Sequence, residues 1–87
     1  MNIDFQHFKS FVDISHVDRL ETDIRRDFAD LIYKNANGVM AHDLAMRIYK
    51  TEGPVELTEE ELNFLNIFVR DTTPIFQDSF KENINNG

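Results

Sequence analysis

Apolar side chains recur at helical spacing along most of this chain. Phe5, Phe8 and Phe11 lie three residues apart, which predicts a short helix from about residue 4 to residue 12. Helical spacing resumes at Val17 and continues to Ile32, before the sequence NANG, whose glycine suits a left-handed helix cap. The pattern therefore predicts a second helix, the longest in the chain, that closes at this glycine.

The second half of the chain predicts three more helices. The first is the segment VMAHDLAMRIYKTEG, which again closes on a glycine, and the second runs from about residue 59 to 70. Phe76, Phe80 and Ile84 lie on one face of the third, which begins near Pro74. Only the sequence GPVEL is typical of a short extended segment. The expected fold is therefore all-α, a small bundle of four to five short helices.

This bundle is predicted to be one domain that spans residues 1–87. Within it, residues 1–14 form the short N-terminal helix, which is a candidate interface, and residues 85–87 form a flexible tail. The chain contains no repeat or low-complexity segment that would suggest a second domain.

Three consecutive glutamates, Glu59 to Glu61, precede an apolar run and raise the question of a binding site. Thr58 stands three residues before Glu61, the spacing of a capping box in which each side chain bonds to the other residue's backbone N–H. Carboxylates in a first helical turn also interact favourably with the helix dipole. The cluster is therefore predicted to start a helix, whether or not it also binds a partner.

The charge of the chain is negative and unevenly distributed. The net charge is −7, and residues 51–87 carry two basic and eight acidic side chains, a net charge of −6. Such a surface repels phosphate backbones and anionic headgroups, so we expect neither direct nucleic-acid binding nor membrane binding. With no long apolar run and no cysteine, the expected location is the cytoplasm.

The sequence offers no catalytic constellation. His7, His16 and His42 do not have the spacing of a zinc site, and the three glycines do not form a phosphate-binding loop. No serine lies in a nucleophile elbow. We expect no enzymatic activity, no catalytic residue, no metal and no cofactor.

Residues 27–80 resemble short uncharacterised helical proteins encoded in phages and prophages. The resemblance rests on the run from Ala29 to Tyr33, on LAMRIYKTEGPVELTEEE and on TPIFQDSF. It implies an origin and a bacterial host cell as the setting, and it transfers no functional residue. A small acidic protein of this kind is expected to bind a host macromolecule and to modulate or inhibit it, for example a nucleic-acid-handling or defence protein.

In the first hypothesis, a protein partner docks on the acidic C-terminal third. Its candidate partner-binding residues are Glu56, Glu59, Glu60, Asp71 and Asp78. The alternative is that these carboxylates form only a solvated face.

In the second hypothesis, the chain is a structural or assembly module and a homo-oligomer. Its candidate self-association residues are Phe5, Phe8 and Phe11, because a short terminal helix with one aromatic stripe needs a surface to pack on. The alternative is that these rings pack inside the chain itself.

A third hypothesis is that an oligomer binds a small ligand between its protomers. Its lining residues are predicted among Tyr33, His42, Arg47 and Tyr49.

Overall fold

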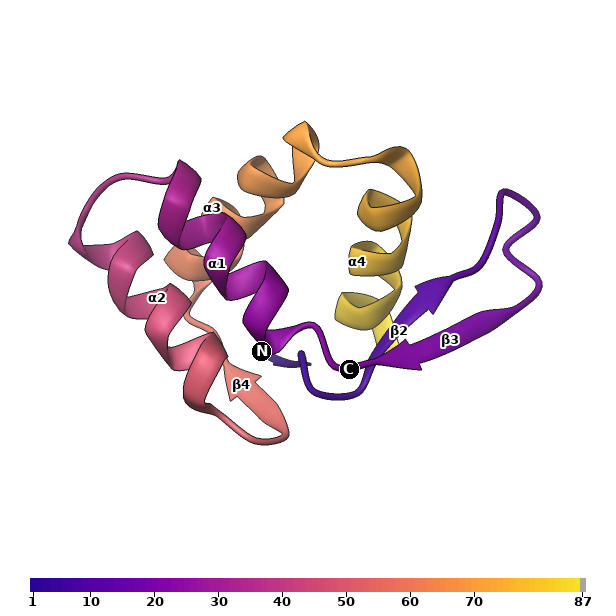
Figure 1. Ribbon diagram of the computed structural model, residues 1–87, viewed down its shortest axis with the longest axis horizontal. Helices are drawn as coiled ribbons and strands as arrows, with labels where there is room; N and C mark the ends of the chain where they lie inside the picture. Colours follow the sequence, from indigo (N-terminus) through magenta and orange to yellow (C-terminus); the bar gives the residue numbers. More distant parts are fainter. Residues whose placement is uncertain (87) are drawn as a thin grey trace.

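The computed structural model describes the backbone of residues 1–86 and the side chains of residues 1–84. A flexible tail was predicted at residues 85–87. The side chains of residues 85 and 86 and the whole of residue 87 lie outside the described part of the chain. The described part contains four α-helices and four short strands (Figure 1). In chain order they are β1 (Asn2–Asp4), β2 (Phe8–Phe11), β3 (Arg19–Thr22), α1 (Arg25–Asn35), α2 (Val39–Lys50), β4 (Pro54–Glu56), α3 (Glu59–Phe68), a 3-10 turn (Val69–Asp71) and α4 (Pro74–Asn86).

The strands form two separate antiparallel pairs. β1 pairs with β4, so that Ile3 lies opposite Val55. β2 and β3 form a hairpin in which Phe8 lies opposite Thr22 and Phe11 lies opposite Arg19. Figure 1 shows this hairpin projecting beyond the helices at one end of the molecule.

The core is one cluster of apolar side chains that draws on every helix and on strands β1, β2 and β4. Phe28 of α1 lies at its centre. Its ring centroid is 5.5 Å from that of Phe5, 5.5 Å from that of Phe76 and 6.3 Å from that of Phe80. Because aromatic rings bury large areas, this cluster provides most of the apolar surface that the small chain removes from water.

The prediction of an all-α helical bundle is wrong, since the fold is mixed α/β with two small sheets. The N-terminal segment 1–14 contains strands β1 and β2 in place of a helix. Between the strands, Asp4 Oδ1 accepts hydrogen bonds from the backbone N–H groups of Gln6 (3.0 Å) and His7 (2.9 Å). This Asx-type turn brings Phe5 and Phe8 to the same core, and their spacing therefore imitated a helix.

The second helix is also shorter than the sequence predicted. Residues 19–22 are strand β3, and α1 begins only at Arg25. The helices predicted after residue 39 are confirmed as α2, α3 and α4, and GPVEL contains the extended segment β4. The capping box is confirmed, with Thr58 N–H donating to Glu61 Oε1 at 2.9 Å and Glu61 N–H donating to Thr58 Oγ1 at 3.1 Å.

No described helix combines the length and the apolar character that crossing a membrane requires.

Candidate functional site

Helix α4 bonds to the projecting hairpin of β2 and β3 along the backbone of β2. The backbone N–H of Phe11 donates to Ser79 Oγ at 3.0 Å. The backbone N–H of Lys9 donates to Asn83 Oδ1 at 3.2 Å, and Asn83 Nδ2 donates to the carbonyl of Lys9 at 2.8 Å. Side chains of α4 thus occupy the outer backbone groups of β2, which would otherwise form an open sheet edge.

The loop of the hairpin is tied to the same helix by His16. Its ring stacks on Phe11 with centroids 4.0 Å apart, and its Nε2 lies 3.2 Å from Asp78 Oδ2. His16 has a positive φ of 57°, and Asp13 Oδ1 accepts hydrogen bonds from the backbone and the hydroxyl of Ser15. These local bonds give the loop a defined shape although it lies outside the core.

Four aliphatic side chains on this hairpin lie in water. The exposed fractions are 57% for Val12, 95% for Ile14, 72% for Val17 and 62% for Leu20. Single exposed aliphatic residues are ordinary, whereas here four occur within one nine-residue segment. We call Val12, Ile14, Val17 and Leu20 the hairpin cluster.

The outer edge of β3 is open among the residues that the structure describes. In an antiparallel pair, residues whose backbone groups face the partner strand alternate with residues whose groups face away. Val12 N–H donates to the carbonyl of Asp18 at 3.1 Å, so that pair faces inward. By this alternation the first and third pairs along the hairpin from it, Phe11 with Arg19 and Lys9 with Glu21, have their backbone groups directed outward. On β2 these groups meet α4, whereas on β3 no described group bonds to the backbone of Arg19 or Glu21.

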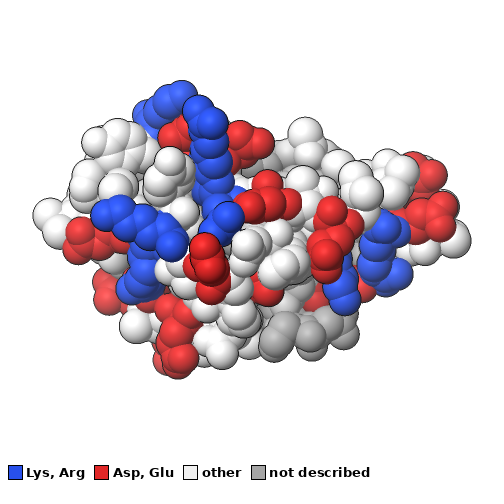
Figure 2. Space-filling view, turned by 60° about the horizontal axis from the view of Figure 1, so that its bottom comes forward, with Lys and Arg blue, Asp and Glu red and all other residues white. Residues whose placement is uncertain are grey.

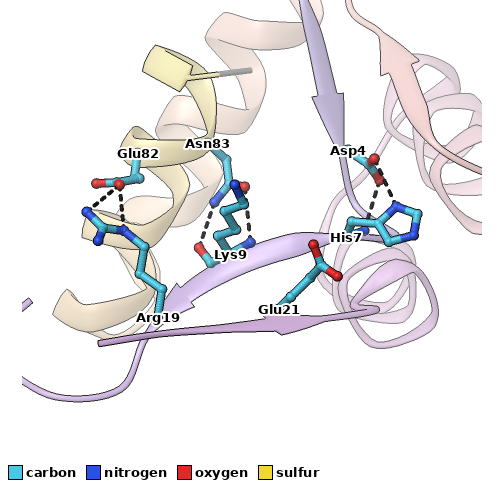
Figure 3. Close-up of a pocket in the computed structure, with 7 residues that line it drawn as sticks. All are labelled: Asp4, His7, Lys9, Arg19, Glu21, Glu82 and Asn83. Carbon is cyan, nitrogen blue, oxygen red and sulfur yellow. Dashed lines mark hydrogen bonds and ion pairs between the residues drawn. The ribbon is translucent and has the colours of Figure 1, made fainter. Parts of the chain in front are cut away.

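A charged cavity of about 630 Å³ lies between the hairpin, the end of α4 and the turn after β1 (Figure 3). Its lining residues are Asp4, His7, Lys9, Arg19, Glu21, Glu82 and Asn83. Most of its charged groups already have partners within the chain. Arg19 Nε donates to Glu82 Oε1 at 2.7 Å, and His7 Nδ1 lies 3.0 Å from Asp4 Oδ2.

The electrostatics of Asp4 in this cavity favour a structural role for its carboxylate. Partial burial alone would raise the pKa of Asp4, but hydrogen bonds from the His7 backbone and ring, and the charge of that ring, lower the pKa overall. A carboxylate with a lowered pKa is a poor general base near neutral pH. The described residues that line the cavity also include no hydroxyl or thiol that an adjacent base could activate.

No group of three or more metal-ligating side chains occurs in the part of the chain that the structure describes.

The structure separates the acidic residues that the sequence proposed for partner binding. Glu56, Glu59 and Glu60 are exposed around the start of α3. Asp71 lies in the 3-10 turn, and Asp78 lies on α4 against His16 of the hairpin. On the face in Figure 2, acidic and basic side chains are interspersed and form no continuous acidic patch.

The aromatic residues proposed for self-association lie inside the chain. Phe5 and Phe8 are fully buried, with ring centroids 6.3 Å apart. Phe11 is buried beneath the His16 ring, with the Arg19 guanidinium carbon 5.0 Å from its own ring centroid. Their surfaces are therefore occupied by neighbours within the same chain.

Two of the residues proposed to line a ligand site do lie in one groove. Tyr33 of α1 and Tyr49 of α2 line a hollow of about 280 Å³ together with Arg26 and Met46. His42 lies beside Tyr33, with ring centroids 5.1 Å apart. Arg47 lies elsewhere, in an ion pair with Glu61.

The hairpin cluster was missed at the sequence level. Its signal is present in the segment FVDISHVDRL, where apolar residues flank the turn-forming residues Asp13 and Ser15. The helical spacing of the phenylalanines outweighed this signal. A hairpin interpretation would have placed the aliphatic residues of the loop on the surface.

Comparison of the chain with protein-family models, curated proteins and solved structures finds no match.

Proposed function

We propose that this chain is a non-enzymatic binding protein that contacts a protein partner through the hairpin cluster. The observation that carries the proposal is the exposure of Val12, Ile14, Val17 and Leu20 on a projecting hairpin. Water contact with these side chains is unfavourable, and a partner that covers them gains about 25 cal/mol for each Å² of apolar area removed from water.

The anchoring of the hairpin supports this proposal. Bonds from Ser79 and Asn83 hold β2, and the contact between His16 and Asp78 holds the loop. A surface that is fixed before binding loses less conformational freedom when the partner docks. The hairpin thus combines exposed apolar area with a defined shape. The acidic residues around α3 do not offer this combination.

The biological setting proposed for this binding follows from the resemblance of residues 27–80 to small phage and prophage proteins. A protein of that kind acts by occupying a surface of a host macromolecule, which blocks or modifies its activity. The partner is expected to offer an apolar groove to the hairpin, and the net charge of −7 favours a partner surface that is basic around that groove.

The test is a comparison of three immobilised proteins in bacterial lysate, with mass spectrometry of the retained proteins. The hairpin variant carries Val12→Thr, Ile14→Thr, Val17→Thr and Leu20→Thr, because threonine keeps a high strand preference while adding a polar group. The matched control carries Val39→Thr and Ile67→Thr, which change two aliphatic residues that are exposed on helices elsewhere.

We expect at least one host protein to be retained by the wild type and the control and lost by the hairpin variant. Circular dichroism establishes that all three proteins have the same helix content. The proposed function would be contradicted if no protein is retained by both the wild type and the control and lost by the hairpin variant.

A further inference from the structure

We propose that the open edge of β3 pairs with β3 of a second copy, which forms a symmetric dimer with a continuous four-stranded sheet. This inference concerns the same hairpin as the proposed function and goes beyond it, because it names one occupant of the edge. The first support is the open edge itself. The outward N–H and C=O groups of Arg19 and Glu21 are the donors and acceptors that an added strand requires.

The second support is the charge pattern of β3, whose sequence is Arg-Leu-Glu-Thr. Two copies of this strand in antiparallel orientation can place Arg19 opposite Glu21 of the second copy, and Glu21 opposite Arg19 of that copy. Because both residues have outward backbone groups, each of these two positions is a hydrogen-bonded pair. Opposite charges directly across two strands stabilise their pairing.

The same register brings Leu20 opposite Leu20 of the second copy. Leu20 is 62% exposed in the single chain, and this contact would cover part of it. Shifting the strands by two residues one way places Arg19 opposite itself and Leu20 opposite Asp18. The opposite shift places Glu21 opposite itself and Leu20 opposite Thr22. Of these three registers, only the one centred on Leu20 avoids like charges opposite each other and places Leu20 opposite Leu20. Charge and apolar contact therefore favour the same register.

Among the described residues, no hydrogen bond occupies the outer edge of β3. All four residues of β3 are exposed, and α4 lies along the other edge of the hairpin. Arg19 contacts Glu82 and the Phe11 ring, which holds its side chain on the same face as Glu21. Leu20 and its diagonal neighbour Val12 share the other face of the hairpin, opposite to the face of Arg19 and Glu21. The dimer would therefore join the apolar faces of two hairpins into one wider surface.

The experiment is sedimentation equilibrium on the full chain at concentrations up to about 1 mM, because so short an interface belongs to the weak class. For the wild type, we expect the average mass to rise with concentration from 10.2 kDa towards twice that value. Arg19→Glu gives β3 two acidic residues, and Glu21→Arg gives it two basic residues. Each variant alone would align like charges, and we expect its dimerisation to weaken about tenfold or more.

An equimolar mixture of the two variants is the decisive sample. The acidic strand of one variant and the basic strand of the other restore opposite charges at both positions, and the mixture should dimerise as the wild type does. The double variant Arg19→Glu/Glu21→Arg restores the pairing within one chain and should also dimerise. Circular dichroism verifies folding of each variant.

A wild type that stays at 10.2 kDa throughout, variants that dimerise unchanged, or a mixture that stays monomeric would overturn the inference. Failure here is distinguishable from failure of the proposed function. A monomeric protein whose hairpin cluster still retains a host protein overturns only the dimer. A dimer that retains nothing overturns only the proposed function.

Discussion

Ser79 Oγ accepts a hydrogen bond from the backbone N–H of Phe11 at 3.0 Å and donates one to the carbonyl of Ile75 at 2.8 Å. Through these two bonds a buried side chain of α4 joins the helix to the outer edge of β2. The hairpin therefore has one edge that its own chain covers and one edge, on β3, that is open. This asymmetry determines where a further strand can add.

Replacement of Ser79 by alanine is expected to lower the free energy of unfolding by about 1–3 kcal/mol. The variant removes the hydroxyl that accepts from the buried Phe11 N–H. The N–H group is then neither hydrated nor hydrogen-bonded in the folded state, which destabilises that state. Urea denaturation followed by circular dichroism measures the change. Ser10→Ala is the control, because Ser10 lies on β2 beside Phe11 and is only partly buried. We expect it to change the free energy of unfolding by no more than about 0.5 kcal/mol. Equal effects of the two substitutions would contradict this account of the β2 edge.

Replacement of Phe8 by alanine is expected to lower the free energy of unfolding by about 3–5 kcal/mol, because the side chain is fully buried among the rings of the core. Thermal or urea denaturation measures the loss. Wild-type stability combined with lost self-association would show instead that Phe8 lies at an interface, as the sequence hypothesis proposed.

The helices of the second half could be predicted from sequence because local signals decide them. Thr58 and Glu61 cap α3 with bonds that span three residues, and apolar spacing alone marks the buried faces of α2 and α4. These features depend on residues close together in the chain, so a pattern contains the information needed to place them.

The N-terminal strands could not be predicted in the same way. β1 pairs with β4 across fifty or more residues, and the edge of β2 is completed by Ser79 and Asn83 of α4. Such contacts leave no local period in the sequence. The hairpin cluster could not be predicted for the same reason. The exposure of its residues follows from the contacts that anchor the hairpin to α4.

The stability of the chain should fall in acid through Glu61. Burial alone would raise the pKa of this carboxyl, but hydrogen bonds from the Thr58 backbone and from Arg47, with the charge of Arg47, lower it below the ordinary value of 4.5. The folded state therefore binds this proton less tightly than the unfolded state does. The resulting stabilisation is present above pH 4.5 and is lost as the pH falls through the lower folded value.

Glu61→Gln tests this dependence. The variant keeps an oxygen that can accept from Thr58 but loses the ion pair with Arg47, so we expect it to be less stable than the wild type by about 1 kcal/mol at neutral pH. The difference should shrink below pH 4.5, as measured by urea denaturation at a series of pH values. Asp4, Asp13 and Asp23, whose pKa values are also lowered, contribute equally in both proteins and cancel in the difference. A difference that stays constant through the acid range would contradict this assignment.

The most direct test of the hairpin account is residue-resolved amide hydrogen exchange, measured by NMR at low and at high protein concentration. In dilute solution the N–H groups of Lys9 and Phe11 should be protected by α4, whereas those of Arg19 and Glu21 should exchange rapidly. At high concentration the Arg19 and Glu21 amides should become protected while Lys9 and Phe11 stay unchanged. Protection of Arg19 and Glu21 at every dilution, or rapid exchange of Lys9 and Phe11, would contradict the account of one covered and one open edge.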